Sequence, residues 1–496
     1  MSARAWLAAS PILLLVVLMA GFGRSAAVAG VAGLALATVL AFGPFDLGAA
    51  SGLAPALAFL GVSLEGLFLA ATVLAIVWPA LALHRWQTET GATERIRAAL
   101  GALAPDTASR TLLIGWFFAL FIEGASGFGT PVALAAPLLV GFGVAPERAV
   151  AVVLIGHSVG VSFGAVGTPV LVQAELVAME GRALAGPTAL IHGLLGPILA
   201  VAAVAWADAV RGAQARALAL ALFAAVAFLA PSVLIAYAIG PELPTLVGAL
   251  AGGALFVLVI TGLRPPSLAG SRLGSALSPY VVLIGLVLAT RLVPPVRALV
   301  EAPVLAWSLF GRFGASVRPL FHPGAVLAVA YFAGGLWRGA RLGVLARAFG
   351  RTALALGPVA IALFAMLALS RLMLHSGMIA VLAEAATRAI GPVYPVLAPA
   401  VGALGAFVTG SATASNILFS ALQRATAEAL DLPPLLLLAA QGVGAGVGNI
   451  VCPHNIVAGA ATVGALGAEG RILRATLLPC LVYLAAAGAV VLSFAR

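Results

Sequence analysis

Long apolar runs separated by short polar connections make up almost the whole chain. In the first half these runs lie near 7–22, 26–43, 54–83, 111–143, 149–178, 186–207, 217–239 and 243–263. In the second half they lie near 277–290, 322–337, 352–370, 376–410, 414–423, 434–468 and 472–494. Because a helix needs about 20 apolar residues to cross the hydrocarbon layer, the pattern predicts an all-α membrane protein, a polytopic helical bundle of about 12–14 membrane segments.

The composition supports a membrane protein and leaves no sizeable soluble domain. Of the 496 residues, 63% are hydrophobic and 8% are charged, against about 25% charged residues in soluble domains. The net charge of +10 comes from arginines that sit mostly between the apolar runs, so it indicates membrane topology and not a nucleic-acid partner. The arginine-bearing connections at 84–110, 208–216, 264–272 and 338–351 can all face the cytoplasm, whereas 291–321 does not fit that scheme. No Cys/His cluster has metal-ligand spacing, so we expect no metal and no cofactor.

Four glycine-rich interruptions divide apolar runs that would otherwise form continuous helices. They lie near 123–131, 162–169, 409–416 and 442–455. The bilayer interior holds no water for free backbone groups, so a break at that depth must line protein or a wet cavity. We therefore expect broken or re-entrant helices that form the functional site. The alternative for the first break is a packing kink, in which small residues permit close helix contact.

The four breaks are related by an internal repeat. Sliding the sequence by 286 positions places Gly124 on Gly410, Thr130 on Asn416, Gly156 on Gly442, Gly160 on Gly446 and Pro169 on Asn455. The repeat divides the chain into a first half, 1–263, and a second half, 264–496, each with two breaks. Paired interruptions at corresponding positions of two halves point to the binding site of a secondary transporter.

The first two breaks offer amides and hydroxyls that suit an anion. Free amides at the start of a helix carry partial positive charge and suit a carboxylate, and Gly127 permits the backbone angles that such a break requires. Ser126 and Thr130 add hydroxyls that can hold a small polar ligand or cap the helix. The second break repeats these devices with Ser162 and Thr168. We predict that these five residues bind the substrate.

The two breaks of the second half carry more polar side chains. The third contributes Ser411, Ser415 and Asn416, which predicts hydrogen bonding to a ligand; the alternative is a polar helix start capped by its own hydroxyls. The fourth contributes Asn449 and His454, which indicate a polar cavity, although its Gly-x-x-x-Gly spacing also fits plain helix packing. We predict that these five residues also line the substrate site.

Ionisable residues at membrane depth are functional candidates because a charge is costly there. Glu123 directly precedes the first break and is the leading candidate to carry a proton; the alternative is a structural role, bonding the free amides of its neighbours. His157 is a candidate to relay that proton. Arg371 lies inside an apolar stretch and can pair with a substrate carboxylate, or reach water from a helix end. Glu65 and Glu175 are weaker candidates, since nothing else marks their surroundings.

Five motifs follow one another in the order found in a known family. They are FIEGASGFGTPVA at 121–133, SFGAVGTP at 162–169, GPELP at 240–244, TGSATASNILF at 409–419 and ATVG at 461–464. On these motifs the chain resembles the lactate permease family over most of its length. The resemblance implies a transporter, not an enzyme, that takes up L-lactate or related 2-hydroxymonocarboxylates such as glycolate with protons. Its partners would be a small carboxylate, a proton and the lipid bilayer of a bacterial inner membrane.

The resemblance also assigns residues to the site. It places around the substrate Glu123, Ser126, Thr130, Ser162, Ser411 and Asn416. Family members can have an acidic residue where this chain has Ala412 and a lysine where it has Asn449. Losing both charges together has no net effect on the site if the two side chains paired with each other. Otherwise the loss signals a changed substrate or coupling ion. Arg371 is a candidate to supply the missing positive charge.

Three other functions stay open on the sequence. One is a membrane-embedded enzyme that acts on a lipid-derived substrate through Glu123, the histidines or Cys452. Another is a sodium-coupled transporter of a different organic anion, and the third is a channel. The repeated breaks favour transport, because an enzyme gains little from duplicated pieces.

Overall fold

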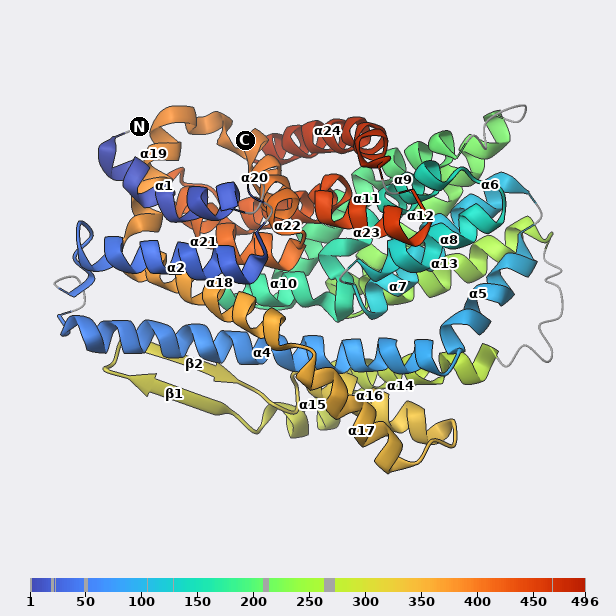
Figure 1. Ribbon diagram of the computed structural model, residues 1–496, viewed down its shortest axis with the longest axis horizontal. Helices are drawn as coiled ribbons and strands as arrows, with labels where there is room; N and C mark the ends of the chain where they lie inside the picture. The colour runs from blue at the N-terminus through green and yellow to red at the C-terminus, as the bar shows by residue number, and fades with distance from the viewer. Residues whose placement is uncertain are drawn as a thin grey trace.

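The protein is a bundle of helices with one small β-hairpin (Figure 1). The computed structural model describes residues 2–18, 22, 24–48, 52–104, 106–127, 129–207, 214–262, 273–465 and 467–495. The helices of the first half are α1 (Ala3–Val16), α2 (Ala26–Phe42), α4 (Pro55–Glu89), α5 (Ala92–Leu103), α6 (Thr107–Arg110), η2 (Thr111–Phe118), α7 (Ala119–Ala125), α8 (Thr130–Gly141), α9 (Pro146–His157), η3 (Ser158–Phe163), α10 (Gly164–Leu176), α11 (Gly181–Trp206), α12 (Gln214–Ala238) and α13 (Pro244–Ile260). The elements of the second half are α14 (Leu273–Leu292), α15 (Pro294–Glu301), β1 (Leu305–Leu309), β2 (Phe313–Val317), α16 (Pro323–Trp337), α17 (Leu342–Leu354), α18 (Gly357–His375), α19 (Met378–Ile390), η4 (Gly391–Val393), α20 (Tyr394–Thr409), α21 (Ala412–Ala429), α22 (Pro434–Gly448), η5 (Asn449–Val451), α23 (Pro453–Thr462) and α24 (Glu469–Phe494).

The apolar runs form membrane-spanning helices. Within the described residues, ten helical segments are long and apolar enough to cross a membrane, and five shorter apolar helices accompany them. One of the shorter helices, α8, is an arm of the first break. The prediction of an all-helical, multi-pass membrane protein with broken helices is confirmed.

The connection 291–321 contains a hairpin that the apolar pattern did not predict. Strand β1 pairs antiparallel with β2 in a two-stranded sheet, and Figure 1 shows both strands beside the long helix α4. Phe313 packs its ring where a Cβ on Gly61 of α4 would lie. The backbone N–H of Gly314 donates to Glu65 Oε1 at 3.0 Å. Each strand has five residues, too few for its alternation to stand out beside runs several times longer.

Helix ends recur at the spacing of the sequence repeat. Helix α4 ends at Glu89 and α18 at His375, and α10 ends at Leu176 and α23 at Thr462, each pair 286 residues apart. The 3-10 helix η3 separates α9 from α10, as η5 separates α22 from α23. The division into two halves stays a prediction, and its boundary between 263 and 264 lies outside the described residues.

Glycines allow helices of the bundle to approach closely. A Cβ on Gly66 of α4 would lie 2.8 Å from the Cα of Ala368 in α18. Within the second half, a Cβ on Gly444 of α22 would overlap the carbonyl of Pro399 in α20. Small residues at helix contacts are the usual means of close packing in membranes, where lipid and side chains are equally apolar.

The contact at Gly66 predicts a stability effect. Gly66→Val forces α4 away from α18, so we expect a loss of about 1–3 kcal/mol, seen as a lower Tm of the detergent-solubilised protein. Gly285→Val is the matched control, because Gly285 lies in helix α14 with no atom within 4 Å of its Cβ position. A Gly66→Val protein that unfolds at the same temperature as the control would show that the two helices do not pack this closely.

Candidate functional site

The four breaks meet around one small polar cavity, called here the central cavity. Its volume is about 40 Å³, room for a few water molecules. It is lined by Glu123, Gly127, Gly129, Val161, Gly164, Ala165, Thr168, Pro169, Gly410, Ser411, Ala412, Thr413 and Asn449. Residues from both halves of the chain therefore share its wall.

Left-handed backbone angles lie at the first three breaks. Gly129, with φ of 76°, precedes α8, and Gly410, with φ of 74°, precedes α21. In the second break Ala165 and Val166 also have positive φ, at 43° and 55°. Left-handed angles cost a non-glycine residue roughly 1–2 kcal/mol, and strain of this kind gathers at functional sites.

Glu123 is the only ionisable residue among the described residues that line the central cavity. It lies on α7, one turn before the break, with its side chain 4% exposed. Oxygen Oε1 occupies the place where a Cβ on Gly164 would stand. Oxygen Oε2 is buried and has no hydrogen-bond partner within the described part of the chain. The absence of a side chain at Gly164 thus makes room for the carboxyl.

His157 faces the free oxygen of Glu123. Its Nε2 lies 3.9 Å from Glu123 Oε2, and its Nδ1 lies 2.6 Å from the carbonyl oxygen of Val153. Because a carbonyl only accepts, Nδ1 carries the hydrogen, and Nε2 of a neutral ring then presents its lone pair to Glu123.

Helix starts supply positive potential where basic side chains do not. Gly129 and Ser411 are the N-caps of α8 and α21, and the regular part of α10 begins at Thr168, after the left-handed residues. All three line the central cavity, and none of the described lining residues is arginine. Converging helix N-termini of this kind bind anions through backbone N–H groups and the helix dipole.

Two predicted ligands bond within the first break and do not line the central cavity. Ser126 Oγ lies 2.7 Å from Thr130 Oγ1. Ser126 also donates to the carbonyl of Ile122, and Thr130 to that of Gly127 at 2.7 Å. Both carbonyls also accept backbone N–H bonds, that of Ile122 from Ser126 and Gly127 and that of Gly127 from Thr130. The hydroxyls thus add to the bonding of the helix ends, which is the capping alternative raised by the sequence.

Two further predicted residues, and one that was not predicted, join the broken helices to one another. Asn416 Nδ2 donates to the carbonyl of Pro169 at 3.1 Å, across the two halves. Ser415 Oγ donates to Gly402 O at 2.7 Å within the second half. Gln441, which the sequence did not single out, donates to Ser415 Oγ at 3.0 Å. These contacts lie behind the wall of the central cavity and fix its shape.

Ser162 ends a buried chain of hydrogen bonds. It donates to Gly442 O at 2.9 Å, so its oxygen accepts from His192 Nε2, also at 2.9 Å. Nδ1 of the same ring lies 2.7 Å from Tyr483 Oη. His192 and Tyr483 stand far from any glycine-rich motif, so no sequence signal marked them.

The fourth break contributes amides to the cavity. Asn449 lines the central cavity, and Asn455 donates to its side-chain oxygen and to its carbonyl, the latter at 3.2 Å. Ala412, the other position where the chain departs from the family pattern, lines the same cavity. His454 lies in α23, but its side chain is outside what the structure describes.

The structure places Arg371 away from the central cavity, beside Glu65. Its Nε lies 3.7 Å from Glu65 Oε2, and His375 Nε2 lies 2.8 Å from the same oxygen. Its Nη1 donates to the carbonyl of Leu176 at 3.5 Å. Arg371 thus pairs with the carboxylate of Glu65. It does not line the central cavity, where the sequence analysis offered it as a partner for the substrate carboxylate.

A larger cavity, called here the inner cavity, adjoins the central one. Its volume is about 380 Å³, within the range of about 300–1,000 Å³ usual for small-molecule sites. Thr409 and Asn455 line it, together with residues of α2, α4 and the first half of α18. It shares Gly410, Ser411 and Thr413 with the central cavity.

Broken membrane helices around a buried polar cavity define a class, the multi-pass membrane transporters. A model of the L-lactate permease family matches residues 4–496, and the chain belongs to that family. The putative L-lactate permease of Haemophilus influenzae is 31% identical over 85% of this chain and 87% of its own length. The glycolate permease GlcA of Escherichia coli is 27% identical, and the L-lactate permease of the same species 26%, each over 84% of this chain and 83% of its own. The chain is therefore a multi-pass protein of a bacterial inner membrane.

The contact between Asn416 and Pro169 predicts a stability effect. Asn416→Leu keeps the volume and removes the buried hydrogen bond to Pro169 O, so we expect a loss of about 0.5–1.5 kcal/mol, measured as a lower Tm in detergent. Thr387→Val is the control, because its hydroxyl donates to Ala383 O of its own helix. If the two variants unfold at the same temperature, the bond does not hold α21 to α10.

Proposed function

We propose that this protein is a secondary transporter that takes up L-lactate, glycolate or a related 2-hydroxymonocarboxylate together with protons. The observation that carries the proposal is the buried carboxyl of Glu123 in a cavity built from helix starts of both halves. Relatives named L-lactate permease and glycolate permease support the substrate class. Transport is favoured over catalysis, because the described lining of the cavity offers a single ionisable group, and no hydrogen bond within the described residues joins it to a hydroxyl that it could activate.

The substrate carboxylate is held by backbone amides at the starts of α8, α10 and α21. Thr168 and Ser411 have hydroxyls at these starts, and Asn449 adds an amide. The 2-hydroxyl group of the substrate therefore has donors and acceptors within the same wall. Ala412 and Asn449 line one cavity, which supports the idea that the charges found there in other family members pair with each other. Losing both leaves the cavity's net charge unchanged.

The proton is carried by Glu123 and relayed by His157. A carboxylate and a substrate anion in one small cavity repel each other strongly at low dielectric. Protonation of Glu123 removes that repulsion, so binding of the anion favours binding of the proton. The lone pair of His157 Nε2 gives the proton a second position within the same buried pair.

The two halves act as repeats around this site. The helix ends spaced by 286 residues and the paired 3-10 helices support this organisation. In transporters built from repeats, one part moves against the other so that a central site opens to each face in turn. The inner cavity, which shares a wall with the central cavity, is then the path to one face.

Reconstitution tests the proposal. Purified protein in liposomes is given labelled lactate or glycolate under an inward proton gradient or an inward sodium gradient. We expect saturable uptake driven by the proton gradient and no accumulation under sodium alone. Absence of uptake under both gradients contradicts transport of these acids, and accumulation under sodium alone contradicts proton coupling.

Glu123→Gln separates coupling from binding. Glutamine has nearly the same shape but carries no proton, so we expect proton-driven accumulation of lactate to fall at least tenfold, while exchange of internal for external lactate continues. Glu384→Gln is the matched control, since Glu384 lies on α19 with its side chain 61% exposed. Accumulation at the wild-type level by Glu123→Gln would remove Glu123 from the coupling mechanism.

A further inference from the structure

A third cavity lies where helices α11 and α14 end, away from the connections 208–216 and 264–272. With the arginines of these two connections on the cytoplasmic side, Gly181 and Leu292 at the other ends of the helices lie outside. The segment 291–321, whose arginines Arg291, Arg297 and Arg318 line this cavity, is the exception to that scheme. Gly181 and Leu292 both line the cavity, which has a volume of about 730 Å³ and is called here the outer cavity. Its polar lining includes Glu175, Arg182, Glu242, Arg291 and His322.

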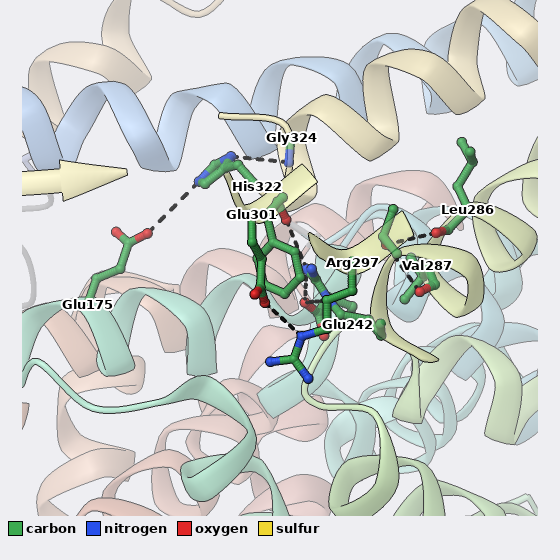
Figure 2. A network of polar contacts seen from close by, with 11 residues as sticks. Glu175, Glu242, Leu286, Val287, Arg297, Glu301, His322 and Gly324 are labelled. Carbon is green, nitrogen blue, oxygen red and sulfur yellow. Dashed lines mark hydrogen bonds and ion pairs between the residues drawn. The ribbon is translucent and has the colours of Figure 1, made fainter. Parts of the chain in front are cut away.

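Glu175 lies at the wall of the outer cavity and contacts two other helices. Its Oε2 lies 3.0 Å from the hydroxyl of Thr72 in α4, which shares its one hydrogen between this oxygen and the carbonyl of Leu69 at 2.8 Å. Its Oε1 lies 3.9 Å from Nε2 of His322, the N-cap of α16. Figure 2 shows the carboxylate and the ring facing each other, with Gly324 on the other side of the ring.

The tautomer of His322 makes this contact a donor facing an acceptor. Burial, and secondly the positive charge of Arg291, lower the pKa of His322 to about 4, so the ring is neutral at neutral pH. Its Nδ1 accepts from the backbone N–H of Gly324 at 3.3 Å, which leaves the hydrogen on Nε2. Nε2 is buried and has no hydrogen-bond partner within the described residues. The carboxylate of Glu175 faces it at 3.9 Å.

Leu176, which follows Glu175 in α10, is bonded to a different helix, α18. The carbonyl of Leu176 accepts from Arg371 Nη1 at 3.5 Å, and Arg371 is itself paired with Glu65 of α4. Two consecutive residues at the end of α10 are therefore fastened to α4, α16 and α18. We call this set of contacts the α10 latch.

The rest of α10 is bonded to the helices of the site. Asn416 of α21 donates to Pro169 O, and Gln173 Nε2 donates to Leu438 O of α22 at 2.9 Å. Helix α10 thus joins the broken helices around the central cavity to α4, α16 and α18. It also separates the cavities, since Thr168 and Pro169 line the central cavity and Glu175 lines the outer one.

We propose that Glu175 is a positioning residue of the transport cycle. Its bonds in the α10 latch keep the central cavity closed to the outer cavity in the state in which the central cavity adjoins the inner cavity. Opening to the outside requires these bonds to break. The substrate then enters through the outer cavity. The inference rests on the proposed transport of 2-hydroxymonocarboxylates and adds the residues that set which face is open.

Sided kinetics test the latch. Lactate transport is measured in right-side-out and in inside-out membrane vesicles, and the half-saturating concentrations on the two faces are compared as an outside-to-inside ratio. Thr72→Val keeps the shape and removes the bond to Glu175. A weaker latch populates the outward-open state, so we expect the ratio to fall roughly tenfold, the order set by one hydrogen bond to a charged group. Glu175→Gln, which removes the charge, shifts the ratio in the same direction.

Two variants distinguish a latch from a general defect. Thr72→Ser retains the hydroxyl and is expected to restore the wild-type ratio. Thr38→Val removes a hydroxyl that donates to Leu34 O within α2 and is expected to leave the ratio unchanged. Wild-type ratios in both Thr72→Val and Glu175→Gln, or an equal loss of rate on both faces, would overturn the latch. Wild-type vesicles that carry no lactate would instead overturn the proposed function.

Discussion

The structure depends on one constraint, that backbone groups inside a bilayer must find partners within the protein. A helix meets that requirement by itself, and a broken helix does not. Each break must therefore be enclosed by other helices or by a polar cavity. The four breaks solve the problem together, because side chains such as Ser126 and Asn416 bond backbone carbonyls at the breaks. The enclosure that satisfies the backbone is also what creates the cavity.

The same arrangement supplies the electrostatics of the site. Backbone N–H groups that lack partners within a helix attract an anion without the desolvation cost of a buried arginine or lysine. A buried carboxyl beside them adds a group whose charge depends on whether a proton is bound. The described lining of the central cavity combines these two elements and little else. In the proposed mechanism, proton coupling follows from the repulsion between two anions in one cavity.

Local patterns in the sequence predicted the helices and the positions of the breaks, because both depend on short stretches of composition. Glu123 was recognisable for the same reason, since it directly precedes a glycine-rich motif. Contacts between distant segments were not predictable in this way. Arg371 had the chemistry of a substrate ligand, but its partner Glu65 stands 306 positions earlier in the chain. The β1–β2 hairpin that covers α4 gave no signal, because its strands are short.

The most direct measurement is a cryo-EM structure of the protein with bound lactate at low pH. The account predicts density for the acid in the central cavity, with its carboxylate at the starts of α8 and α21 and its body within reach of Glu123. The cavity must expand to admit it, and the inner cavity with which it shares Ser411 provides the space. Density for lactate beside Arg371, with the central cavity unchanged, would contradict the account.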